Sequence, residues 1–540
     1  MSVPVFDSSL QTGDEACAEN RAHMLGLLAE LRALEARTAA TSAKSGPRFA
    51  RRGQLLPRER LGLLLDAGAP FLQLASLAGY LQDVADPALS VPGGGCIVGV
   101  GSISGTRCMV VVDDSGIEAG ALQPMGLEKF QRAEQLALEN RLPFVHLVES
   151  AGANLLRYRV EDFIHGGAHY CRLARLSAAG IPVITLVHGS STAGGAYMPG
   201  LSDYVVMVRD RARAFLAGPP LLRAATGEIA TEEELGGALM HATVSGLAEY
   251  VADDDSDGIR ILRELVAGLG WRSCEAPLPQ GPEPCYPSED LLGLMPRDGR
   301  KPVDMREVIA RLVDGSRFLE FKAAHGPGTV CAHASIHGMP VGFLTNNAPL
   351  DPAGSVKATH FIQACCQSGI PLVYLQNTTG YIVGTESERG GMIKHGSKMI
   401  QAVANASVPQ VTIQCGASFG AGNYGMCGRG FAPRFLFSWP NARTAVMGAE
   451  QAATTMAIVM EESARARGLE PDRAQIEGMR TRIVETFERQ TSSFYTSGRM
   501  LDDGIIDPRD TRRVLACVLD LVRRAERVTL RPLDFGVARP

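Results

Sequence analysis

Two blocks of this 540-residue chain occur twice, at nearly the same spacing. Residues 181–197 (IPVITLVHGSSTAGGAY) align with residues 408–424 (VPQVTIQCGASFGAGNY) at an offset of 227. Upstream, residues 142–152 (LPFVHLVESAG) align with residues 370–380 (IPLVYLQNTTG) at an offset of 228. Two matched blocks with almost one offset indicate an internal duplication. Each half is therefore predicted to contain a buried strand ending in a Gly-containing loop, then a second strand ending in a Gly-rich turn that opens a helix.

The remainder of the chain favours an α/β fold. Residues 20–40 have apolar side chains at helical spacing, and residues 96–100 and 107–112 are predicted strands joined by a turn at Ser104-Gly105. Short apolar runs then alternate with helical patterns, which is typical of stacked β-α units.

A Pro-rich segment near the middle of the chain, CEAPLPQGPEPCYPSED, interrupts every periodicity and predicts a domain boundary. The expected organisation has four parts, namely an N-terminal tail, a first domain, a Pro-rich linker and a second domain. Their ranges are 1–22, 23–275, 276–298 and 299–540.

Composition excludes several classes of function. Lys and Arg total 53 against 58 Asp and Glu, and the net charge of -5 leaves no cationic field for nucleic acid. Twelve cysteines without a C-x-x-C motif fit a reducing compartment. The first twenty residues hold acidic side chains but no Lys or Arg, and no apolar run approaches the roughly 18 residues of a membrane span. We expect a cytoplasmic protein that binds neither nucleic acid nor membrane.

The duplicated Gly-rich turns point to a specific chemistry. Where a strand ends and a helix begins on small residues, backbone N–H groups at the positive helix end are open to a ligand and suit a developing oxyanion. Two oxyanion holes would serve a reaction with two carbonyl-like oxygens, one on a donor and one on an acceptor. The alternative is that the glycines only allow helix and sheet to pack closely. The first candidate hole comprises Gly152, Ala153, Gly194, Gly195 and Ala196, and the second comprises Gly380, Tyr381, Ala421, Gly422 and Asn423.

Residues 416–420 (GASFG) match the G-x-S-x-G motif of serine hydrolases. All eleven histidines lie between His23 and His395, so none follows Ser418 and the usual Ser, Asp, His order is impossible. This order disfavours a nucleophilic Ser418.

Residues 253–264 (DDDSDGIRILRE) match a calcium-loop pattern, with Glu264 at the bidentate position. Arg260 stands where an apolar residue is usual, so carboxylates at the start of a helix are the simpler interpretation. His325, His333 and His337 are too loosely spaced to predict a metal site, and no metal is expected in this chain.

A basic stretch at residues 44–60 is either a solvated surface crossing or an arm that contacts the phosphates of a nucleotide-bearing substrate. Neither a dinucleotide-binding motif nor an ATP-binding loop is recognisable elsewhere in the chain.

The duplicated blocks and several further segments together resemble the carboxyltransferase β subunit of biotin-dependent acyl-CoA carboxylases, over nearly the whole chain. GAGNYGMCGR and LQNTTGY are most similar to the methylcrotonoyl-CoA and geranoyl-CoA branch of that family. The other segments that carry the resemblance are STAGGAYMPGLSD (191–203), FLAGPPLLRAATGE (215–228), WPNARTAVMGAEQAA (439–453) and DDGIIDPRDTR (502–512).

The resemblance implies two tandem crotonase-like domains of the β-β-α superhelix type, the N-terminal one binding acyl-CoA and the C-terminal one binding carboxybiotin. It implies active sites shared by two copies of the chain at a β-β interface. Carried over by position, Gly194 and Gly195 would serve the thioester enolate oxygen, and Ala421 and Gly422 the biotin ureido oxygen. Residues 345–361 resemble the family's acyl-CoA-contacting stretch.

The resemblance also implies a partner. The chain has no biotinyl-lysine context and no ATP-binding loop, so biotin is expected in trans from an α subunit that carries the biotin carboxylase and biotin carrier, in a large α-β assembly. The reaction expected is transfer of CO₂ to the γ-carbon of a branched 2-enoyl-CoA, either 3-methylcrotonoyl-CoA or geranoyl-CoA. In the loop 149–159, Asn154 next to Leu155 is expected to open a longer acyl pocket.

Three alternatives to this function stay open. The chain could be a β subunit of the propionyl-CoA or acetyl-CoA type, a biotin-independent hydratase or decarboxylase of the crotonase type, or a non-catalytic scaffold for a biotin enzyme. Activity without biotin would favour the second alternative, and an occluded second hole the third.

Overall fold

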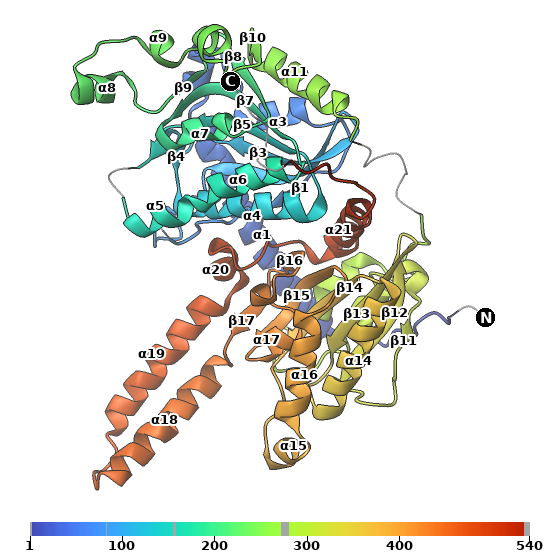
Figure 1. Cartoon of the computed structure of the whole chain (residues 1–540). Coiled ribbons are helices and arrows are strands. Elements are labelled where there is room, and N and C mark those ends of the chain that lie inside the picture. Colours follow the sequence, from blue (N-terminus) through green and yellow to red (C-terminus); the bar gives the residue numbers. More distant parts are fainter. Residues whose placement is uncertain (1–2, 83, 155–157, 272–279, 534–540) are drawn as a thin grey trace. The chain divides into compact units, whose positions relative to one another are not determined.

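The computed structural model describes residues 3–82, 84–154, 158–271 and 280–533, which form two compact units with one large sheet each (Figure 1). We call the units the first and the second by the order of their sheets along the chain. The first unit takes its residues from 33–277, 498–500 and 520–540, and the second from 1–32, 278–497 and 501–519. The boundaries expected from the sequence stay a prediction.

The sheet of the first unit has the strand order β1-β2-β3-β5-β7-β8-β10, with β9 beside the end of β7. β1, β2 and β3 pair antiparallel, and the pairs from β3 onward are parallel. Most residues of the central strands are buried, because helices cover such a sheet on both faces. The strands are β1 (Leu72–Leu74), β2 (Cys96–Ile103), β3 (Thr106–Asp113), β5 (Phe144–Ser150), β7 (Val183–Thr192), β8 (Tyr204–Val208), β9 (Arg213–Phe215) and β10 (Tyr250–Ala252), and a separate small pair consists of β4 (Ala121–Leu122) and β6 (Gly152–Ala153).

The sheet of the second unit repeats this plan in the order β11-β12-β13-β14-β15-β16, with β17 beside the end of β15. Its antiparallel pairs again come first and its parallel pairs follow. The strands are β11 (Leu319–Glu320), β12 (Thr329–Ile336), β13 (Met339–Asn346), β14 (Leu372–Thr378), β15 (Gln410–Phe419), β16 (Phe435–Ser438) and β17 (Arg443–Ala445).

Helices make up most of the remaining described chain. Helix α1 (Glu15–Ala43) begins in the second unit and continues into the first. The helices that follow along the first half are α2 (Gly46–Arg51), α3 (Pro57–Leu64), η1 (Glu118–Gly120), α4 (Pro124–Asn140), α5 (Val160–Gly166), α6 (Ala168–Ala178), η3 (Ala193–Ala196), α7 (Tyr197–Gly200), α8 (Pro219–Thr226), α9 (Glu232–Gly236), α10 (Ala238–Met240), η4 (His241–Ser245) and α11 (Asp255–Gly268). Those of the second half are η5 (Ser288–Asp290), α12 (Leu291–Leu294), α13 (Arg306–Ala310), η6 (Asp314–Ser316), α14 (Pro352–Ser368), α15 (Thr385–Arg389), α16 (Met392–Ala404), α17 (Gly422–Gly425), η7 (Arg429–Phe431), α18 (Ala449–Ala466), α19 (Arg473–Thr491), α20 (Ser493–Gly498), η8 (Pro508–Asp510) and α21 (Thr511–Ala525).

The duplication predicted from the sequence is confirmed by the register of the strands. In the first sheet Phe144 pairs with Val183, and in the second sheet Leu372 pairs with Gln410. Both pairs of strands change register at the same place, two residues before their ends. The helices α4 and α14 both have 17 residues and both begin with proline, which suits the first helical position. The two halves therefore place their Gly-rich turns on equivalent strand ends.

The local elements predicted outside the duplication are also present. Ser104 and Gly105 have φ values of 47° and 78°, as the two central residues of a type I′ hairpin turn require. The strands on either side are longer than the sequence indicated, because their ends have small or polar residues that still pair. Helix α1 contains the predicted stretch 20–40.

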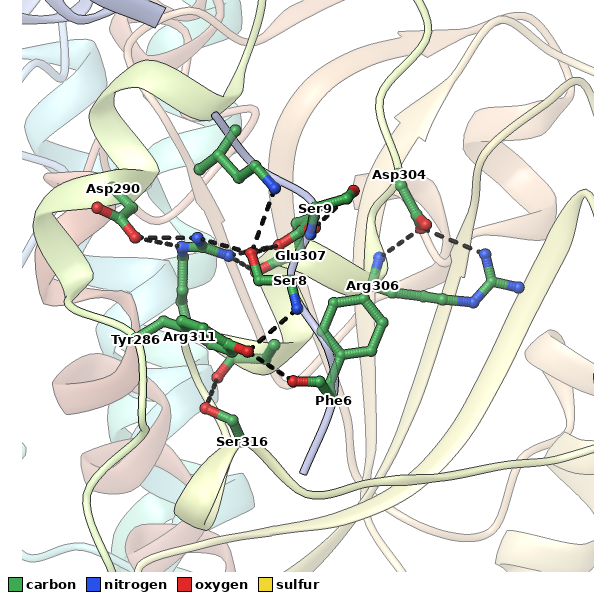
Figure 2. A network of polar contacts seen from close by, with 12 residues as sticks. Phe6, Ser8, Ser9, Tyr286, Asp290, Asp304, Arg306, Glu307, Arg311 and Ser316 are labelled. Carbon is green, nitrogen blue, oxygen red and sulfur yellow. Dashed lines mark hydrogen bonds and ion pairs between the residues drawn. The ribbon is translucent and has the colours of Figure 1, made fainter. Parts of the chain in front are cut away.

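The segment before α1 is hydrogen-bonded to a buried ion pair of the second unit, formed by Glu307 and Arg311. Ser8 Oγ donates to Glu307 Oε2 at 2.6 Å, and the Ser9 amide donates to Glu307 Oε1 at 2.8 Å, as Figure 2 shows. Arg311 pairs with the same carboxylate at 2.7 Å and with Asp290 at 2.9 Å. Because these groups satisfy one another, residues that precede the first helix are an integral part of the second unit.

Helices α18 and α19 form a hairpin of long helices (Figure 1). Glu450 near the start of α18 lies 3.7 Å from Arg480 of α19, as expected for antiparallel helices. Within the described ranges, no helix combines the length and the apolar character needed to cross a bilayer.

Candidate functional site

The first Gly-rich turn follows β7 directly. Ala193 has a φ of 53°, which bends the chain sharply out of the strand, and η3 starts there. The amides of Gly194 and Gly195 lie in the first turn of η3, where no intrahelical carbonyl precedes them. A Cβ atom on Gly195 would lie 3.0 Å from Ser150 Oγ, and one on Gly194 would lie 2.5 Å from the Tyr170 hydroxyl. The turn therefore needs glycine both for packing and for open amides.

The second Gly-rich turn follows β15 in the same way. Gly420 takes the position of Ala193 with a φ of 56°, and Ala421 is the N-cap of α17. A Cβ atom on Gly422 would lie 2.8 Å from Gly380 Cα and 2.9 Å from Thr378 Oγ1. Ala421 is exposed and Gly422 is buried, so the turn presents its backbone at the surface of the second unit.

Several of the expected donors are already used within the protein. The Gly152 amide donates to Ser150 Oγ and the Gly380 amide to Thr378 Oγ1, each at 3.2 Å. The Asn423 amide donates to the Gly420 carbonyl at 3.1 Å.

The remaining members of the two sets are placed as follows. Ala153 belongs to the small strand β6, Ala196 ends η3, and the Tyr381 hydroxyl donates to the Gly396 carbonyl at 3.4 Å. The first-turn amides of Gly194, Gly195, Ala421 and Gly422 are thus the best placed donors among the predicted residues. Leu155, expected beside the acyl pocket, lies outside the described residues.

Tyr170 of α6 is a part of the first site that sequence patterns did not indicate. Its hydroxyl lies over Gly194, and its ring is 6.0 Å from the ring of Tyr197. Burial raises the pKa of Tyr170, so its hydroxyl keeps its proton at neutral pH. Next to Tyr170, His169 forms a fully buried pair with Glu134, whose pKa is raised by burial.

A buried charged cluster lies behind the first site. Arg60 is fully buried and lies 3.4 Å from Asp255 and 2.6 Å from His188 Nδ1. Burial, and then the Arg60 charge, lower the pKa of His188 well below its ordinary value. Its ring is therefore neutral and accepts a hydrogen bond from the Arg60 guanidinium. The basic stretch 44–60 is therefore not a wholly solvated crossing, because its last arginine is a buried structural cation.

The acidic segment 253–264 forms the start of α11. Asp254 Oδ1 caps the helix by accepting the Asp257 amide at 2.9 Å. Asp255 accepts the Leu55 amide at 2.9 Å in addition to its pairing with Arg60. The helix-start interpretation is confirmed, and the carboxylates are occupied by protein donors rather than arranged around a cation site.

The remaining alternatives gain no support from the geometry. Ser418 is fully buried; its hydroxyl donates to Gln376 Oε1 at 2.6 Å and accepts from Asn423 Nδ2 at 2.7 Å. A hydroxyl held in this way cannot act as a nucleophile. His333 lies against the ring of Phe361 at 4.9 Å, and the described residues contain no group of three or more His, Cys, Asp or Glu side chains that could hold a metal.

Comparison with known proteins identifies the family. Residues 49–535 match the family model described as the carboxyl transferase domain. The chain is 47% identical over 524 residues, 96% of its length and 97% of the relative, to the probable biotin-dependent acyl-coenzyme A carboxylase beta2 subunit of Mycobacterium tuberculosis. It is 46% identical over 471 residues, 87% of its length and 80% of the relative, to the mitochondrial methylcrotonoyl-CoA carboxylase beta chain of Dictyostelium discoideum.

A solved structure extends the likeness to the fold. The β subunit of geranyl-CoA carboxylase from P. aeruginosa has 51% sequence identity and a TM-score of 0.93, covering 99% of this chain and 100% of the other. This match confirms the predicted pair of crotonase-like domains. The chain belongs to the carboxyl transferase domain family and is a carboxyltransferase of the kind found in the β subunits of biotin-dependent acyl-CoA carboxylases.

Proposed function

We propose that this chain transfers CO₂ from carboxybiotin, carried by a separate α subunit, to the γ-carbon of a branched 2-enoyl-CoA. The observation that supports this most strongly is the doubling of one structural device. Two equivalent parallel strands, β7 and β15, both end in a turn that starts a helix, where the first amides have no preceding intrahelical carbonyl to bond. A reaction that develops negative charge on two different molecules needs two such sets of donors.

The first turn is assigned to the thioester. Removing a γ-proton from the acyl group places negative charge on the thioester oxygen, and the amides of Gly194 and Gly195 donate to it. The Tyr170 hydroxyl, which keeps its proton, closes one side of this turn. A Cβ atom on Gly195 would lie 3.0 Å from Ser150, so any side chain at this position would displace the amide.

The second turn is assigned to biotin. When bound, carboxybiotin supplies CO₂ and a ureido group that can accept the substrate proton. The amides of Ala421 and Gly422 would hold the ureido oxygen of bound biotin and would stabilise negative charge on it. The fit rests on the cradle at Gly422, which any Cβ atom would fill because Gly380 Cα and Thr378 Oγ1 are so near. Gly152, Ala153 and Ala196 on one side, and Gly380, Tyr381 and Asn423 on the other, shape the two binding surfaces.

The substrate class is taken from relatives whose names specify an enoyl thioester. Relatives named for methylcrotonoyl-CoA and geranyl-CoA share 46% and 51% identity with the chain. Both names denote 3-methyl-2-enoyl thioesters, in which the negative charge spreads along the conjugated system to the γ-carbon. The negative charge on the thioester oxygen is the same for a short and a long acyl group. One amide-lined turn therefore serves acyl groups of either length.

The assembly is part of the proposal. The chain depends on an α subunit for biotin and for ATP-driven carboxylation, works in the cytoplasm, and forms a large α-β assembly in which two copies of the chain share each active site. Its own chemistry needs no metal, since backbone amides supply the stabilisation.

Reconstitution tests the proposed function. The chain is combined with the α subunit of a methylcrotonoyl-CoA or geranyl-CoA carboxylase, and 3-methylcrotonoyl-CoA, geranoyl-CoA, propionyl-CoA and acetyl-CoA are compared as acceptors. We expect ATP- and biotin-dependent carboxylation of at least one of the two enoyl thioesters. Carboxylation of the saturated thioesters alone, or turnover without biotin, would contradict the proposal.

A further inference from the structure

Two glutamines lie in the interior of the second sheet where the first sheet has valines. Gln376 and Gln414 are Cα partners on β14 and β15, and both are buried. The equivalent pair on β5 and β7 is Val148 and Val187. A buried amide without hydrogen bonds is costly, so a polar pair inside a sheet needs further polar partners.

Those partners form a continuous chain within the second unit. Starting from the loop after α20, Asp502 Oδ2 lies 2.7 Å from Ser438 Oγ, which lies 2.9 Å from Gln414 Oε1. Gln414 Nε2 lies 3.2 Å from Gln376 Oε1, which also accepts the Ser418 hydroxyl at 2.6 Å. Asn423 Nδ2 ends the chain on Ser418 Oγ at 2.7 Å. A series of hydrogen bonds therefore joins a buried carboxyl to the Gly-rich turn.

The hydrogen bonds at the Gln376 end determine where the protons lie along this hydrogen-bonded chain. Gln376 Nε2 donates to the Met426 carbonyl at 2.7 Å, which fixes the orientation of that amide and turns its oxygen toward Gln414. Gln414 must then donate to Gln376, which leaves its own oxygen facing Ser438. The Ser438 hydroxyl has a single proton and two acceptors, Asp502 Oδ2 at 2.7 Å and Gln414 Oε1 at 2.9 Å. When the Asp502 carboxyl is protonated, below about pH 6, it can donate to Ser438, and the Ser438 proton is then free for Gln414.

The surroundings of Asp502 agree with a neutral carboxyl. Asp502 is almost fully buried, and the neighbouring Asp503 adds a second carboxylate, which pairs with Arg429 at 3.0 Å. Burial is the main cause that raises the pKa of Asp502 to about 6; the Asp503 carboxylate also raises it, while hydrogen bonds from Ser438 and Ser497 and the charge of Arg429 lower it. Asp502 Oδ1 accepts the Gly504 amide at 3.0 Å, so both oxygens are bonded when the group is protonated.

The two turns are thus held by different means. In the first turn the Ser191 hydroxyl donates to the Gly195 carbonyl at 2.8 Å, and Ala196 has no polar side chain to contribute. In the second turn Asn423, at the equivalent of Ala196, is bonded to the buried chain through Ser418. Among the described residues, hydrogen bonds that continue from the turn to a polar pair deep in the sheet are found for the second turn.

We propose that the hydrogen-bonded chain from Asp502 to Asn423 positions the amides of Ala421 and Gly422 for the biotin ureido oxygen. Gln376, Gln414 and Asp502 are positioning residues in this scheme, since they act through Asn423 and touch no reactant. The inference rests on the proposed function, because it assigns biotin to the second turn. Donors that stabilise a developing charge must be held rigidly in place, and the hydrogen-bonded chain provides that rigidity.

The test uses the complete polypeptide in the reverse half-reaction, the decarboxylation of a γ-carboxylated product in the presence of free biotin, with 3-methylglutaconyl-CoA and γ-carboxygeranoyl-CoA both tried and the one that turns over used for all variants. The variant Gln376→Val/Gln414→Val gives the second sheet the valine pair that the first sheet already has. We expect kcat/KM for biotin to fall by about tenfold or more, while the dissociation constant of the acyl-CoA changes by less than about twofold. Ser316→Ala is the control, because it removes another buried hydroxyl of the second unit, which donates to the Ala310 carbonyl at 2.6 Å and is not part of the hydrogen-bonded chain.

Two variants of Asp502 test the neutral carboxyl separately. Asp502→Asn supplies a permanent N–H donor to Ser438, so we expect it to match the unaltered enzyme below pH 6 and to exceed it above pH 6, where the carboxyl of the parent ionises. Asp502→Leu supplies no donor and is expected to lose as much as the valine pair at every pH.

The possible failures are distinguishable. An unaltered enzyme that shows no biotin-dependent turnover of either γ-carboxylated thioester would overturn the proposed function and this inference with it. An active parent whose valine-pair variant behaves like Ser316→Ala would overturn this inference alone. Equal losses of kcat/KM for biotin in Asp502→Asn and Asp502→Leu would contradict the assignment of a protonated Asp502 as a donor to Ser438.

Discussion

Gln376 and Gln414 face each other across two neighbouring strands, with Gln414 Nε2 3.2 Å from Gln376 Oε1. The duplication makes this contact informative, because Val148 and Val187 occupy the same register in the other sheet. Apolar residues therefore satisfy the fold at these positions, and the glutamines serve another purpose. The two halves of the chain share a backbone plan but differ in how they support the turn that each presents.

Gly195→Ala should abolish most of the acyl-CoA half of the reaction. The added methyl group would lie 3.0 Å from Ser150 and would displace the amide that we assign to the enolate oxygen. Loss of one oxyanion donor costs a factor of about 100 to 1,000 in kcat. Steady-state carboxylation by the reconstituted enzyme measures this loss, and Gly200→Ala is the control because a Cβ atom there meets nothing within 4 Å. Equal activities of the two variants would contradict the assignment.

Gly422→Ala should instead affect the biotin half. Its methyl group would lie 2.8 Å from Gly380 Cα, so the turn must move. We expect biotin-dependent decarboxylation to fall by about 100-fold while the chain still binds acyl-CoA with unchanged affinity. Gly430→Ala, where a Cβ atom again meets nothing within 4 Å, is the matched control. A loss of acyl-CoA affinity in Gly422→Ala would argue against two separate binding surfaces.

Arg60→Leu should destabilise the first unit strongly. It leaves the Asp255 carboxylate, which is 1% exposed, with Arg211 at 3.4 Å as its remaining cation, and breaking a buried ion pair on one side costs up to about 3 to 5 kcal/mol. Urea unfolding of the variant measures the loss, with the exposed Arg58→Leu as control. Adding Asp255→Asn to Arg60→Leu should recover part of the stability, because the buried charge that has lost its Arg60 partner is then removed. Additive losses in the double variant would show that the two residues do not act as a pair.

The stability of the chain should depend on the ionisation of Asp502. Its pKa is raised from 3.8 to about 6, mainly by burial, so the neutral form stabilises the fold below about pH 4 and this contribution is lost as the pH rises through 6. One pKa unit corresponds to about 1.4 kcal/mol, so the whole effect is about 3 kcal/mol. Unfolding by urea at pH 5 and at pH 8 should show a larger pH-dependent loss in the parent than in Asp502→Asn. Identical pH dependence in the two proteins would show that Asp502 does not titrate in this range.

The fold was predictable from the sequence because it is duplicated. The matched offsets of 227 and 228 correspond to strand pairs of equal register, and the glycines shared by both turns, Gly195 and Gly422, were recognisable because a Cβ atom at either would approach a neighbour within 3.0 Å. Turn chemistry also revealed the hairpin at Ser104-Gly105, since both residues adopt positive φ.

Long-range polar partners could not be predicted in this way. Arg60 and Asp255 lie 195 positions apart in the chain, and each was interpreted within its own charged segment, one as part of a basic stretch and the other as part of an acidic one. The hydrogen-bonded chain from Asp502 to Asn423 could not be predicted for the same reason. Its members lie on separate strands and loops, and no local sequence pattern shows that they are in contact. The sequence did contain one signal for this hydrogen-bonded chain, namely that the second repeat has two glutamines where the first has two valines.

A structure of the chain in complex with an enoyl-CoA and biotin tests the central claim most directly. We predict the thioester oxygen within about 3 Å of the amides of Gly194 and Gly195, and the ureido oxygen within about 3 Å of the amides of Ala421 and Gly422. Both molecules at one turn, or either turn left without a carbonyl oxygen in the ternary complex, would contradict it.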